Sequence, residues 1–241
     1  MVFPGAGDHS GFHPLLSILI MNDAGLTDAR GNPDFLNPRV TEALRFINTL
    51  YVNGYIPDGV PGYRSSDSER VYQSGRAAMS LFPMLDLSEF PEVDANSAVM
   101  PAIRGPSATI GRNYAWVNAI GGYSQTRDAD RTRSVIRWLV ENEGGLWEAG
   151  RMTSLPARAS LRELPYFNNN WQTRQVNELV MPTAATPVHP ASSIYLAWSV
   201  IEAELVPMNA LVLACAPNPN YAAIQQDIQN WMIRAWAEFN R

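Results

Sequence analysis

The chain has 241 residues, of which 46% are hydrophobic and 17% charged, so it holds enough apolar material for a packed core. Its formal net charge of −5 without a basic run argues against nucleic acid as a partner, which requires a concentrated positive face. We expect no signal peptide, because Met1–His9 carries no basic residue and the apolar run Leu15–Met21 is too short to span a membrane.

Two helices are predicted near the start of the chain. The first covers about Phe12–Asp23 and is closed by Gly25. The second begins with Asn37 as N-cap and Pro38 at the first helical position, and it ends before Gly54. Its apolar residues recur at helical spacing, which predicts a buried face made of Val40, Ala43, Leu44, Ile47, Leu50 and Tyr51.

The next segments alternate between helix and short strand. Ser66 and Glu69 have the spacing of a capping box at the start of a third helix, which ends at Gly75. Ala77–Phe82 and Ser97–Met100 predict short buried strands, each stopped by a proline.

Helices dominate the second half of the chain. A strand is expected inside Gly105–Gly122, and Asp128 then opens a helix. The inner face of this helix is predicted to be Val135, Ile136, Leu139 and Val140. The last helices are expected at about Trp171–Val180, Ala191–Leu205 and Tyr221–Phe239. This order indicates an α/β fold, a helix-rich lobe with a small sheet covered by helices and a C-terminal helical extension.

The side chains that common catalytic and metal sites require are scarce. His9, His13 and His189 are the only histidines and stand in no metal-ligand spacing. Cys215 lies in an apolar stretch, which is typical of a buried small side chain. No nucleophile elbow and no glycine-rich phosphate loop is present. We therefore assign no catalytic residue, no metal ion and no cofactor.

Aromatic and amide side chains gather where strands and helices are predicted to end. Phe82 closes a strand, Asn113, Tyr114 and Trp116 share one segment, and Tyr195 begins a late helix. Sugars bind to such mixtures, because their apolar faces stack on rings while their hydroxyls hydrogen-bond to amides and carboxylates. Ordinary core packing is the alternative interpretation of each ring.

Several segments, taken in order, resemble the family 1 extracellular solute-binding proteins, the maltose-binding-protein-like receptors of bacterial ABC importers. The capped helix Asn37–Pro57 is similar to one of their helices, and Tyr72–Leu81 resembles their Phe-x-x-Gly-x-Ala-Ala-Met run, with Tyr72 in place of phenylalanine. The further matching segments are Ala98–Ala102, Asn118–Ser124, Ala129–Glu143 and Ser154–Arg158.

The resemblance implies a periplasmic-binding-protein-like fold of two lobes that close on a sugar or similar polar solute by hinge motion. It also implies ABC importer permease subunits as partners and an extracellular or periplasmic location, as a lipoprotein in full-length members. The family's amino-terminal lobe is expected before Ser10. Residues 1–165 are therefore interpreted as the second α/β lobe and residues 166–241 as a C-terminal helical segment that completes the lobe interface.

Binding residues are carried over from the resemblance position by position. The segment Phe82–Leu87 matches a ligand-stacking segment, although the expected tryptophan is absent at Met84–Leu85. The segment before Asn118 and the helix start near Ser193 match other lining segments, and the first helix faces the cleft. The candidate ligand-binding residues are Phe12, His13, Phe82, Asp86, Asn113, Tyr114, Trp116 and Tyr195.

Two other functions remain open from the sequence. One is a carbohydrate-active enzyme that uses two carboxylates, although no pair is marked by its setting. The other is a non-functional truncated fragment, or an assembly partner. Because a cleft between two lobes takes contacts from both, we expect the chain alone to bind a solute very weakly. Apolar faces such as that of Ala191–Leu205 are expected to favour self-association.

Overall fold

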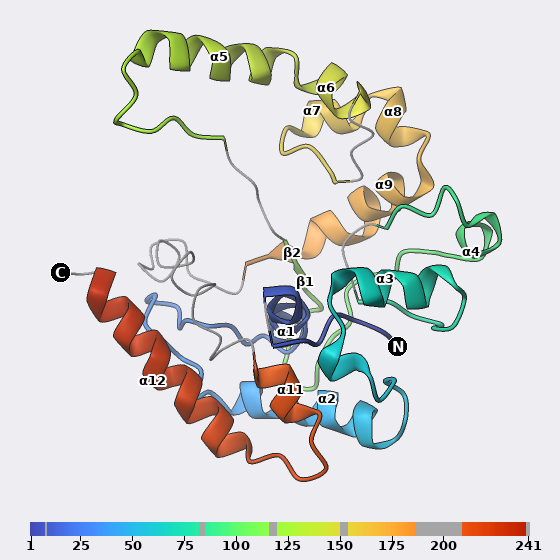
Figure 1. Cartoon of the computed structure of the whole chain (residues 1–241), viewed down its shortest axis with the longest axis vertical. Helices are drawn as coiled ribbons and strands as arrows, with labels where there is room; N and C mark the ends of the chain where they lie inside the picture. The colour runs from blue at the N-terminus through green and yellow to red at the C-terminus, as the bar shows by residue number, and fades with distance from the viewer. Residues whose placement is uncertain (8, 82–84, 116–119, 150–153, 187–208, 240–241) are drawn as a thin grey trace.

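The computed structural model describes residues 1–7, 9–81, 85–115, 120–149, 154–186 and 209–239 (Figure 1). Helices dominate, and a small two-stranded sheet lies between two groups of them. One group, in the lower part of Figure 1, contains α1, α2, α11 and α12; the other, at the top, contains α5 to α8. This arrangement confirms the helix-rich fold class that the sequence predicts.

The lower group surrounds the main hydrophobic core. It consists of α1 (His9–Met21), α2 (Pro38–Val52), α11 (Ala210–Ala214) and α12 (Tyr221–Phe239), with the amino-terminal residues packed against them. The largest fully buried side chains of this core are Phe3, Phe12, Phe35, Leu15, Leu16, Leu19, Leu26, Leu44, Ile47 and Ile56. Residues from both predicted segments thus share one core, and the division at residue 165 stays a prediction.

Helix α2 forms as its sequence signals predict. The side chain of Asn37 accepts a hydrogen bond from the Arg39 amide at 3.0 Å, and Pro38 occupies the first helical position. Gly54 follows the helix with φ +71°, a left-handed conformation that glycine adopts without strain. Four members of the predicted apolar face are buried, and Leu50 and Tyr51 are half-buried against the core.

The turn Thr27–Phe35 is fastened to α12 by glutamine side chains. Gln225 donates to the Phe35 carbonyl at 2.8 Å, and the Phe35 amide donates to Gln229 at 2.7 Å. Gln229 in turn donates to the Pro33 carbonyl at 3.0 Å. Two residues of the last helix therefore satisfy backbone groups of a turn close to the start of the chain, which seats the Phe35 ring in the core.

The region after α2 differs from the sequence prediction in three details. Helix α3 (Ser65–Gln73) follows the 3-10 turn Val60–Gly62, and its first turn is closed by the Arg64 amide donating to Asp67 at 3.0 Å. The prediction of a capping box at Ser66 and Glu69 is therefore wrong, because the helix begins two residues earlier, with Arg64 as N-cap and Asp67 as its partner.

The predicted strands of this region are also largely wrong. Within Ala77–Phe82, of which the structure describes residues 77–81, only Ser80 forms a bridge, parallel to Val2, with the Leu81 amide donating to the Val2 carbonyl at 3.0 Å. Ser97–Met100, after the short helix α4 (Pro91–Ala95), forms neither a helix nor a strand ladder. Both segments carry the composition of strands, and a strand needs a neighbour that sequence composition does not supply.

The upper group contains α5 (Ala129–Glu141), α6 (Glu143–Ala149), α7 (Ala159–Arg162) and α8 (Pro165–Asn168). Asp128 caps α5 as predicted, accepting from the Arg131 amide at 2.9 Å. The predicted inner face of α5 is not buried, however: Val135 is 53% and Val140 45% exposed. Within this group Phe167 is buried and makes edge contacts with Trp147 and Tyr166.

The chain returns toward the sheet through α9 (Trp171–Gln175), the π-helical turn Val176–Val180 and the 3-10 turn Met181–Thr183. The predicted helix Trp171–Val180 is thus confirmed, with a looser second half. The expected helix Ala191–Leu205, and with it the expected self-association surface, lies outside the described residues.

Cys215 follows α11 and is buried in the core, as the sequence predicts. Burial raises the pKa of its thiol to about 11, because the thiolate loses its hydration there. We expect the folded chain at pH 8 to react with an aromatic disulfide reagent on the order of 100-fold more slowly than the chain in denaturant, because the thiolate is the reactive form. Equal rates in the two states would contradict this assignment.

Candidate ligand-binding site

The two-stranded sheet forms the centre of the candidate site. Strand β1 (Asn113–Tyr114) pairs in parallel with β2 (Ala184–Ala185), and the Ala115 amide donates to the Ala185 carbonyl at 2.9 Å. The Asn113 side chain donates to the Thr183 hydroxyl at 3.1 Å, next to β2. The expected strand inside Gly105–Gly122 is therefore confirmed, although it is only two residues long.

Helix α1 lies against this strand. His13 Nδ1 and the Tyr114 hydroxyl are 3.3 Å apart, and the two rings stack with centroids 5.9 Å apart. Both side chains are half-buried, and Tyr114 also packs against the main core. The structure thus brings together His13 and Tyr114, two of the predicted site residues, whereas the side chain of Asn113, the preceding residue of β1, bonds to Thr183.

The other predicted site residues fall elsewhere. Phe12 is only 2% exposed and belongs to the hydrophobic core. Asp86 is exposed on a loop beside α3, where its backbone carbonyl accepts from Gln73 at 3.1 Å. Phe82, Trp116 and Tyr195 lie outside the described residues. Contact of these residues with a ligand stays a prediction.

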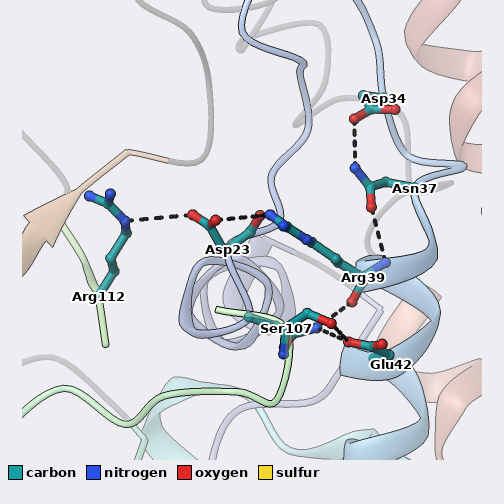
Figure 2. A network of polar contacts seen from close by, with 8 residues as sticks. Asp23, Asp34, Asn37, Arg39, Glu42, Ser107 and Arg112 are labelled. Carbon is teal, nitrogen blue, oxygen red and sulfur yellow. Dashed lines mark hydrogen bonds and ion pairs between the residues drawn. The ribbon is translucent and has the colours of Figure 1, made fainter. Parts of the chain in front are cut away.

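A buried amide links the segment that leads into β1 with the ends of two helices. Asn22, just after α1, donates to the Arg39 carbonyl and to Glu42 Oε2, both at 2.9 Å. Its oxygen accepts from the Ser107 amide at 3.2 Å, and the Ser107 hydroxyl donates to Glu42 Oε2 at 2.6 Å (Figure 2). Asn22 is thereby hydrogen-bonded both to α2 and to the 105–107 segment.

A second link lies on the neighbouring residue. Asp23 has φ +55°, a conformation that is uncommon outside glycine and asparagine or aspartate. Its carboxylate lies between two arginines, 2.9 Å from Arg39 Nη1 and 3.7 Å from Arg112 Nε (Figure 2). Arg112 directly precedes β1. We call Asn22, Asp23, Arg39, Glu42, Ser107 and Arg112 the corner network.

The corner network is not predictable from local sequence signals. The Asn-Asp pair after the first helix was the only local signal, and polar residues at a helix end are common. The partners lie far along the chain, with Ser107 85 residues from Asn22. Such pairs become visible only once the fold places them together.

Hydrogen bonds from Asn22 and then Ser107 hold the pKa of the Glu42 carboxyl below its usual value of 4.5. The ionised Glu42 carboxylate therefore contributes its full share to the stability of the fold above pH 4.5. This contribution is lost as the pH falls through the lower pKa of the folded state. We expect Glu42→Gln to be less stable than wild type at neutral pH and to lose less stability on acidification. Urea unfolding midpoints of both proteins, measured from pH 6 downward, check this. An equal fall of the midpoint with pH in wild type and variant would contradict it.

An open hollow of about 440 Å³ lies at the start of α5. It is lined by Gly121, Gly122, Tyr123, Gln125, Thr126 and Thr132. Figure 1 places this loop away from β1. Its glycines, amide and hydroxyls are of the kind that contact polar solutes. The Tyr123 side chain is 85% exposed, however, so it does not cover the hollow.

Two other features bear on the kind of site. Within the described ranges, His, Cys, Asp and Glu side chains form no group of three that could hold a metal ion. No helix in the part of the chain that the structure covers combines the length and apolar character needed to cross a membrane.

The architecture places the chain among known folds. No protein-family model matches the sequence, and no curated protein does. Solved structures of sugar-binding proteins, an oligosaccharide periplasmic-binding protein from Synechococcus among them, share the fold over nearly the whole chain, so this chain has the fold of part of a periplasmic binding protein. The resemblance found in the sequence is thereby confirmed for the fold.

Three of these structures illustrate the likeness. A sugar transporter from Arthrobacter chlorophenolicus A6 with bound laminaribiose superposes on 97% of the chain, with a TM-score of 0.84 and 17% identity. Maltose-bound MalE3 of T. maritima superposes on 97%, with 0.71 and 21%, and the sugar-binding protein MalE of Xanthomonas citri on 98%, with 0.70 and 18%. The chain spans 59% of the length of each of these proteins.

Proposed function

We propose that this chain is the solute-binding component of a bacterial ABC importer and that its solute is a carbohydrate. The observation that carries the proposal is the superposition of 97% of the chain on a laminaribiose-bound sugar transporter, with a TM-score of 0.84. Two further neighbours are named for maltose or sugar binding. A binding protein rather than an enzyme is proposed, since these neighbours are named as binding or transport proteins.

The chemistry around β1 supports a sugar as the solute. The stacked His13 and Tyr114 rings have flat apolar faces, and the same short strand carries the Asn113 amide, a group that can bond to hydroxyls. Such a pairing of rings and amides suits a pyranose, which has an apolar face and a rim of hydroxyls. We place the solute in a cleft between two lobes, to which these residues contribute one side.

The proposal extends to the setting of the whole protein. A receptor of this kind works outside the cytoplasmic membrane, in the periplasm or at the cell surface, and delivers its solute to permease subunits. This part of the proposal rests on the likeness of the fold and on no particular residue. Pull-down of permease subunits with the chain, with and without sugar, tests this part separately.

Isothermal titration calorimetry of the chain tests the solute class. We expect saturable heat from at least one oligosaccharide in a panel that includes laminaribiose and maltose, and none from amino acids or polyamines. The affinity is expected to be weaker than micromolar, because a two-lobed cleft takes contacts from both lobes and the chain spans 59% of the neighbours' length. Heat from amino acids but from no sugar would contradict the carbohydrate assignment.

Turnover assays separate this proposal from a glycoside hydrolase. A panel of chromogenic glycosides is expected to remain intact in the presence of the chain. Hydrolysis that disappears when a single Asp or Glu is replaced would establish the enzymatic alternative instead.

A further inference from the structure

The corner network is unusual because its centre is a buried polar side chain whose nitrogen and oxygen are both hydrogen-bonded. Asn22 is 3% exposed, donates both amide protons and accepts one hydrogen bond. A buried amide that lost one of these partners would keep its desolvation penalty without compensation. The geometry around Asn22 is therefore strongly specified.

The segment before β1 is pressed against this amide. The Gly105 amide donates to the Met21 carbonyl at 2.7 Å, and a Cβ atom at position 105 would overlap the Asn22 side-chain oxygen. Only glycine allows the backbone to approach this closely. Ser107, two residues on, then bonds to both Asn22 and Glu42.

A second attachment lies immediately before the strand. The Arg112–Asp23 pair spans 3.7 Å and is about one-third exposed on each side, so it is weaker than the buried hydrogen bonds. Segment 105–112 is thus held to the same helix corner near both of its ends. The residues that follow are Asn113 and Tyr114 of the candidate site.

We propose that the corner network positions β1 against α1, so that Tyr114 is held at His13 in the geometry that binds the solute. This inference rests on the proposed function for its last step only. The residues of the network are positioning residues: they act through β1 and do not touch the solute. Glu42 and Ser107 carry the attachment, and Asp23 with Arg112 sets the approach to the strand.

Hydrogen exchange tests the anchoring without any solute. Ser107→Ala removes the hydroxyl bond to a carboxylate, and we expect the amides of residues 105–115 to exchange roughly 10- to 100-fold faster while those of α12 are unchanged. Arg112→Gln is expected to act in the same direction with a smaller effect. Ser107→Thr, which keeps the hydroxyl, should restore much of the protection.

The matched control is Ser134→Ala. Its hydroxyl donates to a backbone carbonyl, that of Asp130, on the exposed surface of α5, so exchange in residues 105–115 should stay as in wild type. Unchanged exchange in both Ser107→Ala and Arg112→Gln would overturn the anchoring. Equal acceleration across the whole chain would overturn it as well, because this indicates global destabilisation.

Sugar affinity tests the positioning. We expect Ser107→Ala to weaken binding by roughly 10-fold, whereas Ile228→Val, a core change in α12 of comparable stability cost, leaves affinity unchanged. Faster exchange with unaltered affinity would overturn the positioning role while the proposed function stands. Should the wild-type chain bind no sugar, the proposed function fails, and the exchange rates alone then decide whether β1 is anchored.

Discussion

Replacing Phe35 with alanine is expected to lower the free energy of unfolding by about 3–5 kcal/mol. The ring is fully buried in the main core. Its removal deletes apolar contacts and leaves a cavity that the surrounding helices fill only in part. Loss of this ring also loosens the seat of the turn on α12, because the hydrogen bonds to Gln225 and Gln229 flank it on the backbone.

Urea unfolding followed by circular dichroism measures this effect. The matched control is Phe46→Ala on α2, where the ring is 49% exposed, and its cost should stay within about 1 kcal/mol. A loss below 1 kcal/mol for Phe35→Ala would show that the turn does not contribute to the core as described.

Replacing Tyr114 with alanine is expected to weaken sugar binding by roughly 30-fold or more, which corresponds to about 2 kcal/mol. The ring is the partner of His13 and follows directly on Asn113 in β1. Tyr114→Phe keeps the ring and removes only the hydroxyl near His13 Nδ1, so a loss of up to about tenfold is expected. This ranking follows if the ring surface contributes more than the hydroxyl.

Calorimetry with the best-binding sugar checks both variants. Tyr55→Ala provides the control, since that ring is 64% exposed after α2 and should not alter affinity. Thermal unfolding must accompany each titration, because Tyr114 also packs on the core. Wild-type affinity in a folded Tyr114→Ala variant would remove Tyr114 from the binding site.

Elements with local signals could be predicted from the sequence. Helix α2 carries its own cap, an N-terminal proline and a terminal glycine, and the structure reproduces each of them. Asp128 marks α5 in the same way. These signals act within one helical turn, so they do not depend on the remainder of the fold.

Features that depend on distant partners were predicted less well. The apolar spacing in α5 identifies one face, but it does not say what covers that face, and Val135 is 53% exposed. The strand expected at Ser97–Met100 has suitable composition and no ladder. The same limit hid the corner network, whose hydrogen bonds join residues up to 85 positions apart.

The candidate site was predicted in part. Comparison of the sequence with the solute-binding family pointed to His13 and Tyr114, which the structure places side by side, and to Asn113, which precedes Tyr114 in β1. Burial of Phe12 agrees with the apolar sequence of α1, where Leu15, Leu16, Ile18, Leu19 and Ile20 are buried as well.

The glutamines of α12 that hold the turn at Phe35 also constrain how the chain folds during synthesis. Gln225 and Gln229 are 190 and 194 residues from Phe35, so these bonds are among the most non-local in the molecule. Non-local contacts form slowly, since a long loop must close first. While the ribosome is still making the middle of the chain, α1 and α2 have no C-terminal helix to pack against. Until α12 emerges, the apolar faces of α1 and α2 lack their native partner. Chaperone binding or non-specific collapse must then keep these faces out of water.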